Sequence, residues 1–378
     1  MFTLILPTYN EKDNLKVYLP KLESSFQKNK IKYEIIVVDD DSPDETWKWV
    51  KEYSEKNPNV RVIRRIKDRG LSSAVITGMA SAKGDVLGVM DADMQHDESI
   101  IPKMIEELSM YDLIVGSRKT EGGSYGEMNF IRRVISHGAT LLAKILLPIN
   151  TTDPMSGFFI LKKEVFEKSK EKLNPLGFKI LLEFLAKNPG IKVGEVGYSF
   201  RKREFGETKL SGTVMQQYIL ALLDLRFGSY FSVQFIKYGI IGFLGVFVNL
   251  FGQWIYNEFS GNFITHNADS KLILPSSAVA FGFEISVISN YILNNTWTFS
   301  DQRKRGIFPF LFGLIKFNFV SLVGFLIQYS CWFFLFQIFT NLFPNFIPAL
   351  VPYLANLVGI VVATVSNYHL NRSFTWGK

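Results

Sequence analysis

Cysteine is nearly absent from this chain of 378 residues, and Cys331 is the single example. One thiol cannot form a disulfide within a chain, which excludes a small secreted fold held together by disulfides. Because Cys331 lies inside an apolar run, we interpret it as a buried small hydrophobic side chain. The sequence also lacks a zinc knuckle or other nucleic-acid-binding module, so its formal net charge of +7 does not predict a nucleic-acid partner.

Charged residues are missing from much of the second part of the chain. No Asp, Glu, Lys or Arg occurs from residue 317 to residue 368. The first 230 residues, in contrast, lack a long apolar run, and Met1–Pro7 is too short and lacks the basic flank of a signal peptide. The composition therefore predicts a cytosolic domain over residues 1–230 and a transmembrane domain over residues 231–378.

The apolar part is long enough for four membrane-spanning helices. We place them at residues 235–257, 272–293, 310–339 and 347–368. The segment Asn290-Tyr291-Ile292-Leu293-Asn294 is echoed by Asn367-Tyr368-His369-Leu370-Asn371 at an offset of about 80 residues, which predicts a duplicated two-span hairpin. Glu284 lies within the second span, where a carboxylate is expected to pair or to function, with Lys237, Lys316 or His369 as its partner.

Basic residues gather at one set of connections. Arg226 precedes the first span and Lys237 lies at its start, Arg303-Lys304-Arg305 lie between the second and third, and Arg372 follows the fourth. Because cytosolic loops retain Lys and Arg, this pattern predicts a multi-pass membrane protein whose soluble domain and termini face the cytosol.

Strand-like and helix-like segments alternate along the first domain. Strands are expected at residues 2–6, 34–38, 60–63, 86–90 and 113–116, and helices at 12–28, 44–56, 72–81 and 100–108. This alternation predicts an α/β fold with a mostly parallel, Rossmann-like sheet. Polar clusters at residues 7–11, 39–44 and 91–95 follow three of the strands, where such sheets bind their ligands.

Two further apolar segments are interrupted by charges such as Lys144 and Asp224. Residues 130–149 and 212–231 are too polar to span a bilayer, but both suit helices that lie in the membrane interface. Ordinary packing against the domain core fits them equally well.

The strongest chemical motif is Asp91-Ala92-Asp93-Met94-Gln95-His96. It places two carboxylates and an amide at alternate positions after an apolar strand. Such oxygen ligands suit a hard cation, Mg²⁺ or Mn²⁺, which would neutralise a diphosphate. Taken alone, the motif could also be a solvated turn without a metal.

The surrounding motifs resemble a known family. Together with the strand-end clusters, they resemble the GT-A glycosyltransferases that act on polyprenyl phosphates, typified by dolichol-phosphate mannose synthase, over roughly residues 1–215. The motifs are Gly70-Leu71-Ser72-Ser73-Ala74, Asp91–His96, Gly116-Ser117-Arg118 and Asp153-Pro154-Met155-Ser156-Gly157-Phe158-Phe159. The membrane part resembles the GtrA-like four-span domain.

This resemblance implies roles for individual residues. The nucleotide site would include Pro7, Tyr9, Glu11, Val38 and Asp40, and Asp91, Ala92 and Asp93 would face the diphosphate. Asp93 and Gln95 would bind the metal, with Asp91 in support. Asp91, Asp93 and Arg118 would be catalytic, Arg203 and Lys209 would bind the donor, and the lipid phosphate would contact Arg118, Arg132, Ser136 and Arg203. Without the motifs, we would interpret each single arginine as a solvated side chain.

The activity implied is inverting transfer of a hexose to dolichyl or polyprenyl phosphate, and we favour mannose from GDP-mannose. A lipid phosphate is already ionised, so it needs positioning and charge compensation rather than a general base. His96 and His137 are therefore expected to pack or cap. Alternatives are a UDP-glucose:undecaprenyl-phosphate transferase, and a lipid-linked sugar flippase or anchor with a degenerate transferase domain. A processive synthase is disfavoured because its Gln-x-x-Arg-Trp signature is absent.

Overall fold

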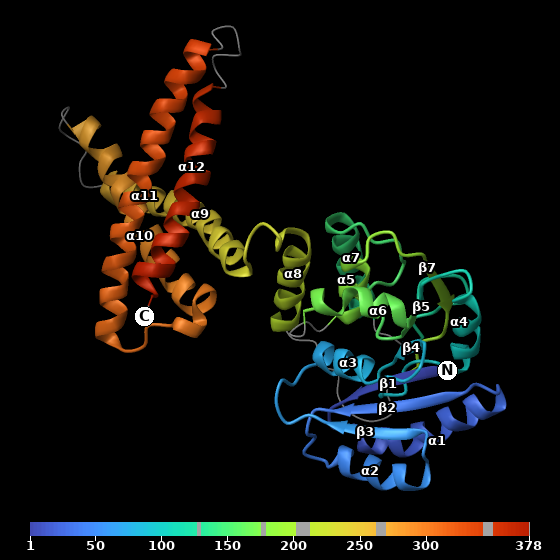
Figure 1. The fold of residues 1–378 in the computed structure, drawn as a ribbon. Coiled ribbons are helices and arrows are strands. Elements are labelled where there is room, and N and C mark those ends of the chain that lie inside the picture. The colour runs from blue at the N-terminus through green and yellow to red at the C-terminus, as the bar shows by residue number, and fades with distance from the viewer. Residues whose placement is uncertain (127–129, 175–178, 202–211, 262–269, 343–350, 378) are drawn as a thin grey trace. The chain divides into compact units, whose positions relative to one another are not determined.

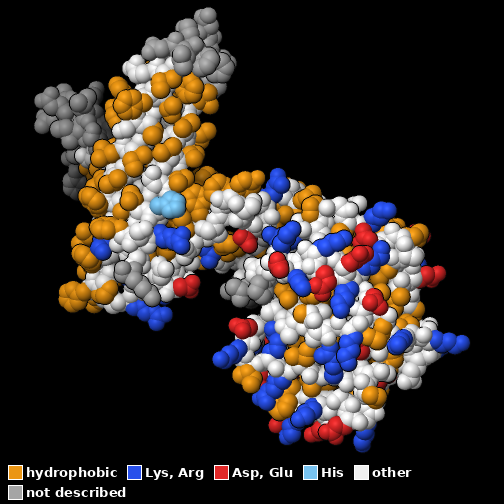
Figure 2. Space-filling view, in the orientation of Figure 1, with side chains coloured by type: hydrophobic (Ala, Val, Ile, Leu, Met, Phe, Trp, Pro, Cys, Tyr) orange, Lys and Arg blue, Asp and Glu red, His pale blue; other side chains and the backbone are white. Residues whose placement is uncertain are grey.

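The computed structural model describes residues 1–126, 130–174, 179–201, 212–261, 270–342 and 351–377 (Figure 1). The chain divides into two compact units, Met1–Phe227 and Gly228–Lys378, and each is described by itself. Charged side chains cover the first unit, whereas hydrophobic ones cover the helices of the second (Figure 2).

The first unit is built on a sheet of seven strands in the order β3-β2-β1-β4-β6-β5-β7. The strands are β1 (Phe2–Thr8), β2 (Tyr33–Asp39), β3 (Val60–Arg64), β4 (Val86–Val89), β5 (Leu113–Ser117), β6 (Phe159–Lys162) and β7 (Val193–Gly197). Only β6 runs antiparallel to its neighbours, β4 and β5. The expected mostly parallel α/β sheet is therefore confirmed, with β6 and β7 as strands that the sequence pattern did not predict.

Helices cover both faces of this sheet. They are α1 (Lys12–Lys28), α2 (Thr46–Lys56), α3 (Leu71–Ala80), α4 (Ile101–Glu107), α5 (Phe130–Leu146), α6 (Lys163–Ser169), α7 (Ile180–Lys187) and α8 (Gly212–Phe227). Successive side chains of β1 point to opposite faces of the sheet and so enter two separate hydrophobic cores. Leu4 and Leu6 pack with α1 and α4, whereas Ile5 packs with α3. Figure 1 shows α3 on the side of β1 and β2 opposite α1 and α2. The carboxyl ends of β1, β2 and β4 consequently share one edge.

The two segments expected at the membrane interface form α5 and α8. The two helices pack against each other and against α7, and the contact includes Ala143 of α5, Leu182 of α7 and Leu222 of α8. The Tyr218 hydroxyl of α8 donates a hydrogen bond to the Ala139 carbonyl of α5 at 2.6 Å. Other apolar side chains of α5 stay exposed, among them Phe130, Ile131, Val134, Leu141 and Ile145. Core packing thus accounts for the buried face of α5. That its exposed apolar face lies in the membrane interface remains a prediction.

The second unit consists of long apolar helices. They are α9 (Val233–Gly261), α10 (Ser270–Leu293), α11 (Ile307–Leu342) and α12 (Val351–Leu370), and short π-helical turns, η3 (Asn294–Thr298) and η5 (Asn371–Thr375), follow α10 and α12. Among the described residues, Val233–Phe259 and Ile307–Phe339 are long and apolar enough to cross a membrane. A total of four spans remains a prediction.

The two helical hairpins, α9–α10 and α11–α12, make the same close approach. A Cβ atom on Gly245 would collide with the side-chain amide of Asn290, and one on Gly324 would collide with that of Asn367. Small residues allow helices to pack closely in an apolar environment, where amides of facing helices also interact. The asparagines that the repeat singled out therefore lie at helix crossings.

The partner of Glu284 differs from the expected basic residues. The Asn318 side-chain amide of α11 donates a hydrogen bond to the Glu284 carboxylate of α10 at 2.7 Å. Lys316 instead donates to the Phe374 carbonyl at 3.2 Å, and Lys237 lies over the Trp297 ring. The carboxylate is thus held by a neutral amide that the sequence pattern did not identify.

Candidate active site

A pocket of about 270 Å³ opens at the shared edge of the sheet. It receives side chains from the ends of β1, β2 and β4 and from the start of α3. Its lining is Pro7, Thr8, Tyr9, Glu11, Asp40, Leu71, Ala74, Asp91, Ala92 and Asp93. Every residue expected at the nucleotide and diphosphate lies here except Val38, Arg203 and Lys209. Val38 is fully buried in the core beside α3, and Arg203 and Lys209 lie outside the described residues.

The buried carboxylate of Asp39 joins the ends of β1 and β2. It accepts hydrogen bonds from the Thr8 hydroxyl at 2.9 Å, the Ser42 amide at 2.9 Å and the Ser42 hydroxyl at 2.6 Å. The Ser42 hydroxyl accepts one from the Asn10 amide at 2.9 Å. These bonds fix the two loops that carry Tyr9, Glu11 and Asp40 into the pocket.

Arg65 is a residue of this site that the sequence pattern did not reveal. Its guanidinium forms a buried ion pair with Asp40, whose other oxygen accepts from the Gly70 amide at 2.7 Å. Arg65 also donates to the Ser73 hydroxyl at 2.8 Å and the Gly70 carbonyl at 3.0 Å. It therefore secures the start of α3 against the end of β2. The sequence does contain one indication of such a residue. Three consecutive aspartates, residues 39–41, require basic partners if they are buried.

Replacing Arg65 with leucine is expected to destabilise the first unit by about 3–5 kcal/mol, because Asp40 would remain buried without its counter-ion. Arg64→Leu is the matched control. Its partner Asp41 is more exposed, so its loss is expected to cost less than about 1 kcal/mol. Thermal and denaturant unfolding measure both variants. An Asp40→Asn/Arg65→Leu pair should recover part of the loss, and equal effects of the two single variants would refute this account.

Asp91, Asp93 and Gln95 alternate with buried residues. Ala92 and Met94 enter the core, which leaves the carboxylates on the pocket side. The Asp91 carboxylate lies 3.4 Å from His96 Nε2, and His96 Nδ1 lies 2.6 Å from the Tyr198 hydroxyl. Burial opposes ionisation of Asp91, but the hydrogen bond with His96 and nearby positive charges outweigh it and hold the pKa of this carboxyl below its ordinary value. His96 packs among aromatic rings, as expected, and also positions Asp91.

The donor set at Asp93 and Gln95 fits a magnesium-type site. The Gln95 backbone amide donates to Asp93 Oδ1 at 3.2 Å, and the Gln95 side-chain amide donates to the Arg201 carbonyl at 3.2 Å, so both side chains are held in place. Among the described residues no group of three or more His, Cys, Asp or Glu gathers into a metal cage. Mg²⁺ commonly takes only one or two protein carboxylates and completes its shell with phosphate oxygens and water.

Arg118, expected at the lipid phosphate, is paired with Asp153. The guanidinium donates to both carboxylate oxygens, at 2.7 and 2.8 Å, and lies over the Phe200 ring. Burial works against the charge of Asp153, but Arg118 outweighs it and lowers the pKa of that carboxyl. A phosphate at Arg118 would therefore compete with this carboxylate. Of the other expected lipid-phosphate ligands, Ser136 is half-buried on α5, and the side chain of Arg132 lies outside the described residues.

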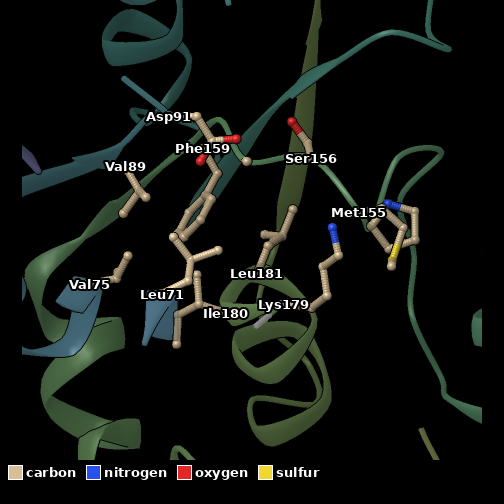
Figure 3. A pocket seen from close by; sticks show the side chains of 12 residues that line it. Leu71, Val75, Val89, Asp91, Met155, Ser156, Phe159, Lys179, Ile180 and Leu181 are labelled. Atoms are coloured by element: carbon tan, nitrogen blue, oxygen red, sulfur yellow. The ribbon is translucent and has the colours of Figure 1, made fainter. Parts of the chain in front are cut away.

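A second, smaller cavity of about 60 Å³ adjoins the pocket and shares Leu71 and Asp91 with it. Lys179, which precedes α7, extends into this cavity, whose far side carries Asp91 and Ser156 (Figure 3). Burial lowers the pKa of its ammonium group, although Asp91 acts in the opposite direction. Lys179 is a cation of the site that sequence reasoning missed, because nothing in its local pattern links it to Asp91.

Comparisons with known proteins match both parts of the chain. Residues 3–169 match the family described as glycosyl transferase family 2, and residues 237–376 match the GtrA/DPMS transmembrane domain. The chain is 40% identical over 380 residues to a dolichol-phosphate mannosyltransferase of Pyrococcus furiosus, covering 99% of each protein. It is 39% identical to the Saccharomyces cerevisiae dolichol-phosphate mannosyltransferase over 66% of this chain and 97% of that protein. A solved glucosyl-3-phosphoglycerate synthase of Mycobacterium tuberculosis, with Mn²⁺ and UDP-glucose, aligns at a TM-score of 0.46 and 18% identity over 60% of this chain and 79% of that one.

Proposed function

Because the chain belongs to glycosyl transferase family 2 and carries a GtrA/DPMS transmembrane domain, we propose that it transfers mannose from GDP-mannose to a polyprenyl phosphate such as dolichyl phosphate. It is a glycosyltransferase and a membrane protein by family. The donor, the acceptor and the number and orientation of its spans form the proposal, with the first unit and both termini in the cytosol.

One observation carries the proposal: a pocket gathers Pro7, Tyr9 and Glu11 at the end of β1 with Asp91 and Asp93, which follow β4. The β1 side offers the aromatic ring and carboxylate that would bind base and ribose. The β4 side offers oxygen ligands at the place where the diphosphate would lie. A cation held by Asp93 and Gln95, with Asp91 in support, would neutralise the departing nucleoside diphosphate.

The protein's own residues supply positioning for the acceptor. A phosphate monoester is largely ionised at neutral pH, so it can attack the sugar without a general base, and a single displacement inverts the anomeric centre. Arg118, Arg132, Ser136 and Arg203 are proposed to hold that phosphate, and Arg203 and Lys209 the donor. Lys179, which lines the same small cavity as Asp91, would donate a hydrogen bond to the transferring sugar.

Two alternatives are retained from the sequence. A UDP-glucose:undecaprenyl-phosphate transferase would use the same pocket with another base. A flippase or anchor would need no intact donor site, and the organised Asp91–His96–Tyr198 chain disfavours it.

A donor assay tests the proposal. Membranes containing the full chain, polyprenyl phosphate and Mg²⁺ or Mn²⁺ are given radiolabelled GDP-mannose or UDP-glucose. We expect label in the lipid phase from GDP-mannose, with the β-mannosyl product, and loss of transfer after chelation of the metal. Transfer from UDP-glucose alone would establish the first alternative, and movement of preformed lipid-linked sugar without transfer would establish the second.

A further inference from the structure

A separate hollow of about 650 Å³ lies in the second unit, at the loop between α10 and α11. One part of its lining is cationic and the other apolar. The lining is Ile292, Asn295, Thr296, Arg303, Lys304, Arg305, Gly306, Ile307, Phe310 and Leu311. All of these belong to one unit, and none belongs to the pocket at the sheet.

Three consecutive cations face this hollow without a carboxylate partner. Arg303 and Arg305 are exposed, and none of the three makes an ion pair within the part of the chain that the structure describes. Asp301, the nearest acid in sequence, is exposed two residues before them. Among the described residues, the Lys304 ammonium makes one long contact, 3.5 Å, with the Gly377 carbonyl. The charge is thus available to an external anion.

The backbone that presents these cations is fixed. Asn295 is buried, and its side chain accepts from the Lys304 amide at 2.8 Å and donates to the Lys304 carbonyl at 3.3 Å. The Trp376 indole donates to the same Asn295 oxygen at 3.1 Å, and its ring stacks on Phe299 with centroids 4.3 Å apart. The preference of basic residues for cytosolic loops requires only that these residues are present. It therefore does not explain why their backbone is held in place by Asn295.

Apolar side chains beside the cations indicate the class of ligand. Ile292 is 43% exposed, Ile307 75% and Leu311 49%, which together form an apolar wall. A small soluble anion would leave this wall unused, whereas a lipid would cover it with its chain. The charge favours a phosphate monoester over a phosphodiester headgroup, because a monoester approaches two negative charges at neutral pH.

We propose that this cationic hollow binds the phosphate of a polyprenyl phosphate whose chain lies along Ile292, Ile307 and Leu311. The inference rests on the proposed function, since the ligand belongs to the acceptor class of that reaction. It adds a binding site for that acceptor on the membrane unit, apart from the catalytic pocket.

The test uses the full chain in phosphatidylcholine nanodiscs that contain polyprenyl phosphate. In an Arg303→Gln/Lys304→Gln/Arg305→Gln variant, we expect retention of polyprenyl phosphate in native mass spectrometry to fall at least about tenfold, since each interfacial cation contributes about 1 kcal/mol to the binding of an anionic lipid. The KM for polyprenyl phosphate should rise in parallel, while the KM for GDP-mannose stays unchanged. The matched control, Lys28→Gln/Lys30→Gln/Lys32→Gln, removes the same charge from exposed positions of the first unit.

Competing ligands separate the possible sources of the phosphate. Phosphatidylglycerol and inorganic phosphate should displace polyprenyl phosphate poorly. Unchanged retention in the triple variant overturns the proposal, as does equally strong competition by phosphatidylglycerol, which would make the hollow a general site for anionic lipids. If the wild-type protein transfers no mannose but still retains polyprenyl phosphate through these cations, the proposed function fails and this site stands.

Discussion

Replacing Asp93 with asparagine is expected to lower the turnover number by a factor of roughly 10³ while leaving the fold intact. The amide keeps the shape of the side chain and removes the charge that would bind the metal and, through it, the diphosphate. Because the Asp93 side chain is partly exposed at the pocket, its neutralisation should not disturb the core. Initial rates with saturating GDP-mannose, and titration of Mn²⁺ in the presence of GDP, measure the two consequences.

The matched control for this variant is Asp85→Asn. Asp85 directly precedes β4, at the opposite end of the same strand, is exposed, and pairs with the chain's amino group at 3.3 Å. It should retain full turnover and ordinary metal dependence. Near-normal turnover of Asp93→Asn, with the same metal requirement, would remove Asp93 from the metal site and leave Gln95 and Asp91 to be tested.

Replacing Lys179 with methionine is expected to lower kcat/KM for the donor by about 10²-fold, the effect of losing one preorganised donor at the reacting centre. The same change should raise the midpoint of thermal unfolding. Burial lowers the pKa of the Lys179 ammonium, so the folded state binds its proton less tightly than the unfolded chain and is penalised for carrying the charge. A lysine with a purely structural role would lower stability when removed.

The pH profile provides an independent check on Lys179. If the reaction requires the charged ammonium of Lys179, activity falls as the pH rises through the pKa of this group. Because burial lowers that pKa, the fall occurs at a lower pH than for an ordinary lysine. Lys179→Arg keeps the charge at every accessible pH and should move this alkaline limb upward. Lys187→Met, at the other end of α7, is the control and should leave the limb in place. A limb that is identical in wild type and Lys179→Arg would contradict the assignment.

Local pattern predicted those parts of the site that lie at strand ends. Tyr9, Asp40 and Asp93 could be placed together because polar residues after parallel strands meet at one edge of the sheet. The alternation of Asp91 and Asp93 with buried Ala92 likewise follows from strand geometry. These inferences required only neighbours in sequence and the topology of the sheet.

The remaining parts depend on contacts between distant segments. The pairing of Arg118 with Asp153, and of Asp40 with Arg65, is set by loops whose paths the sequence pattern does not specify. Lys179 enters the site because α7 packs against the same face as α3, and a lone lysine before an apolar helix carries no signal of that. The strand β6 is only four residues long and antiparallel, which periodicity cannot distinguish from a loop.

The order of the two units along the chain has a consequence for biosynthesis. The sheet of the first unit is completed by β7, which ends at Gly197, and the first long apolar helix begins only at Val233. Because domains generally fold in the order in which they are synthesised, the catalytic unit can form its core before a hydrophobic segment is available for membrane insertion. The nascent chain would then reach the bilayer with the pocket at the edge of the sheet already assembled.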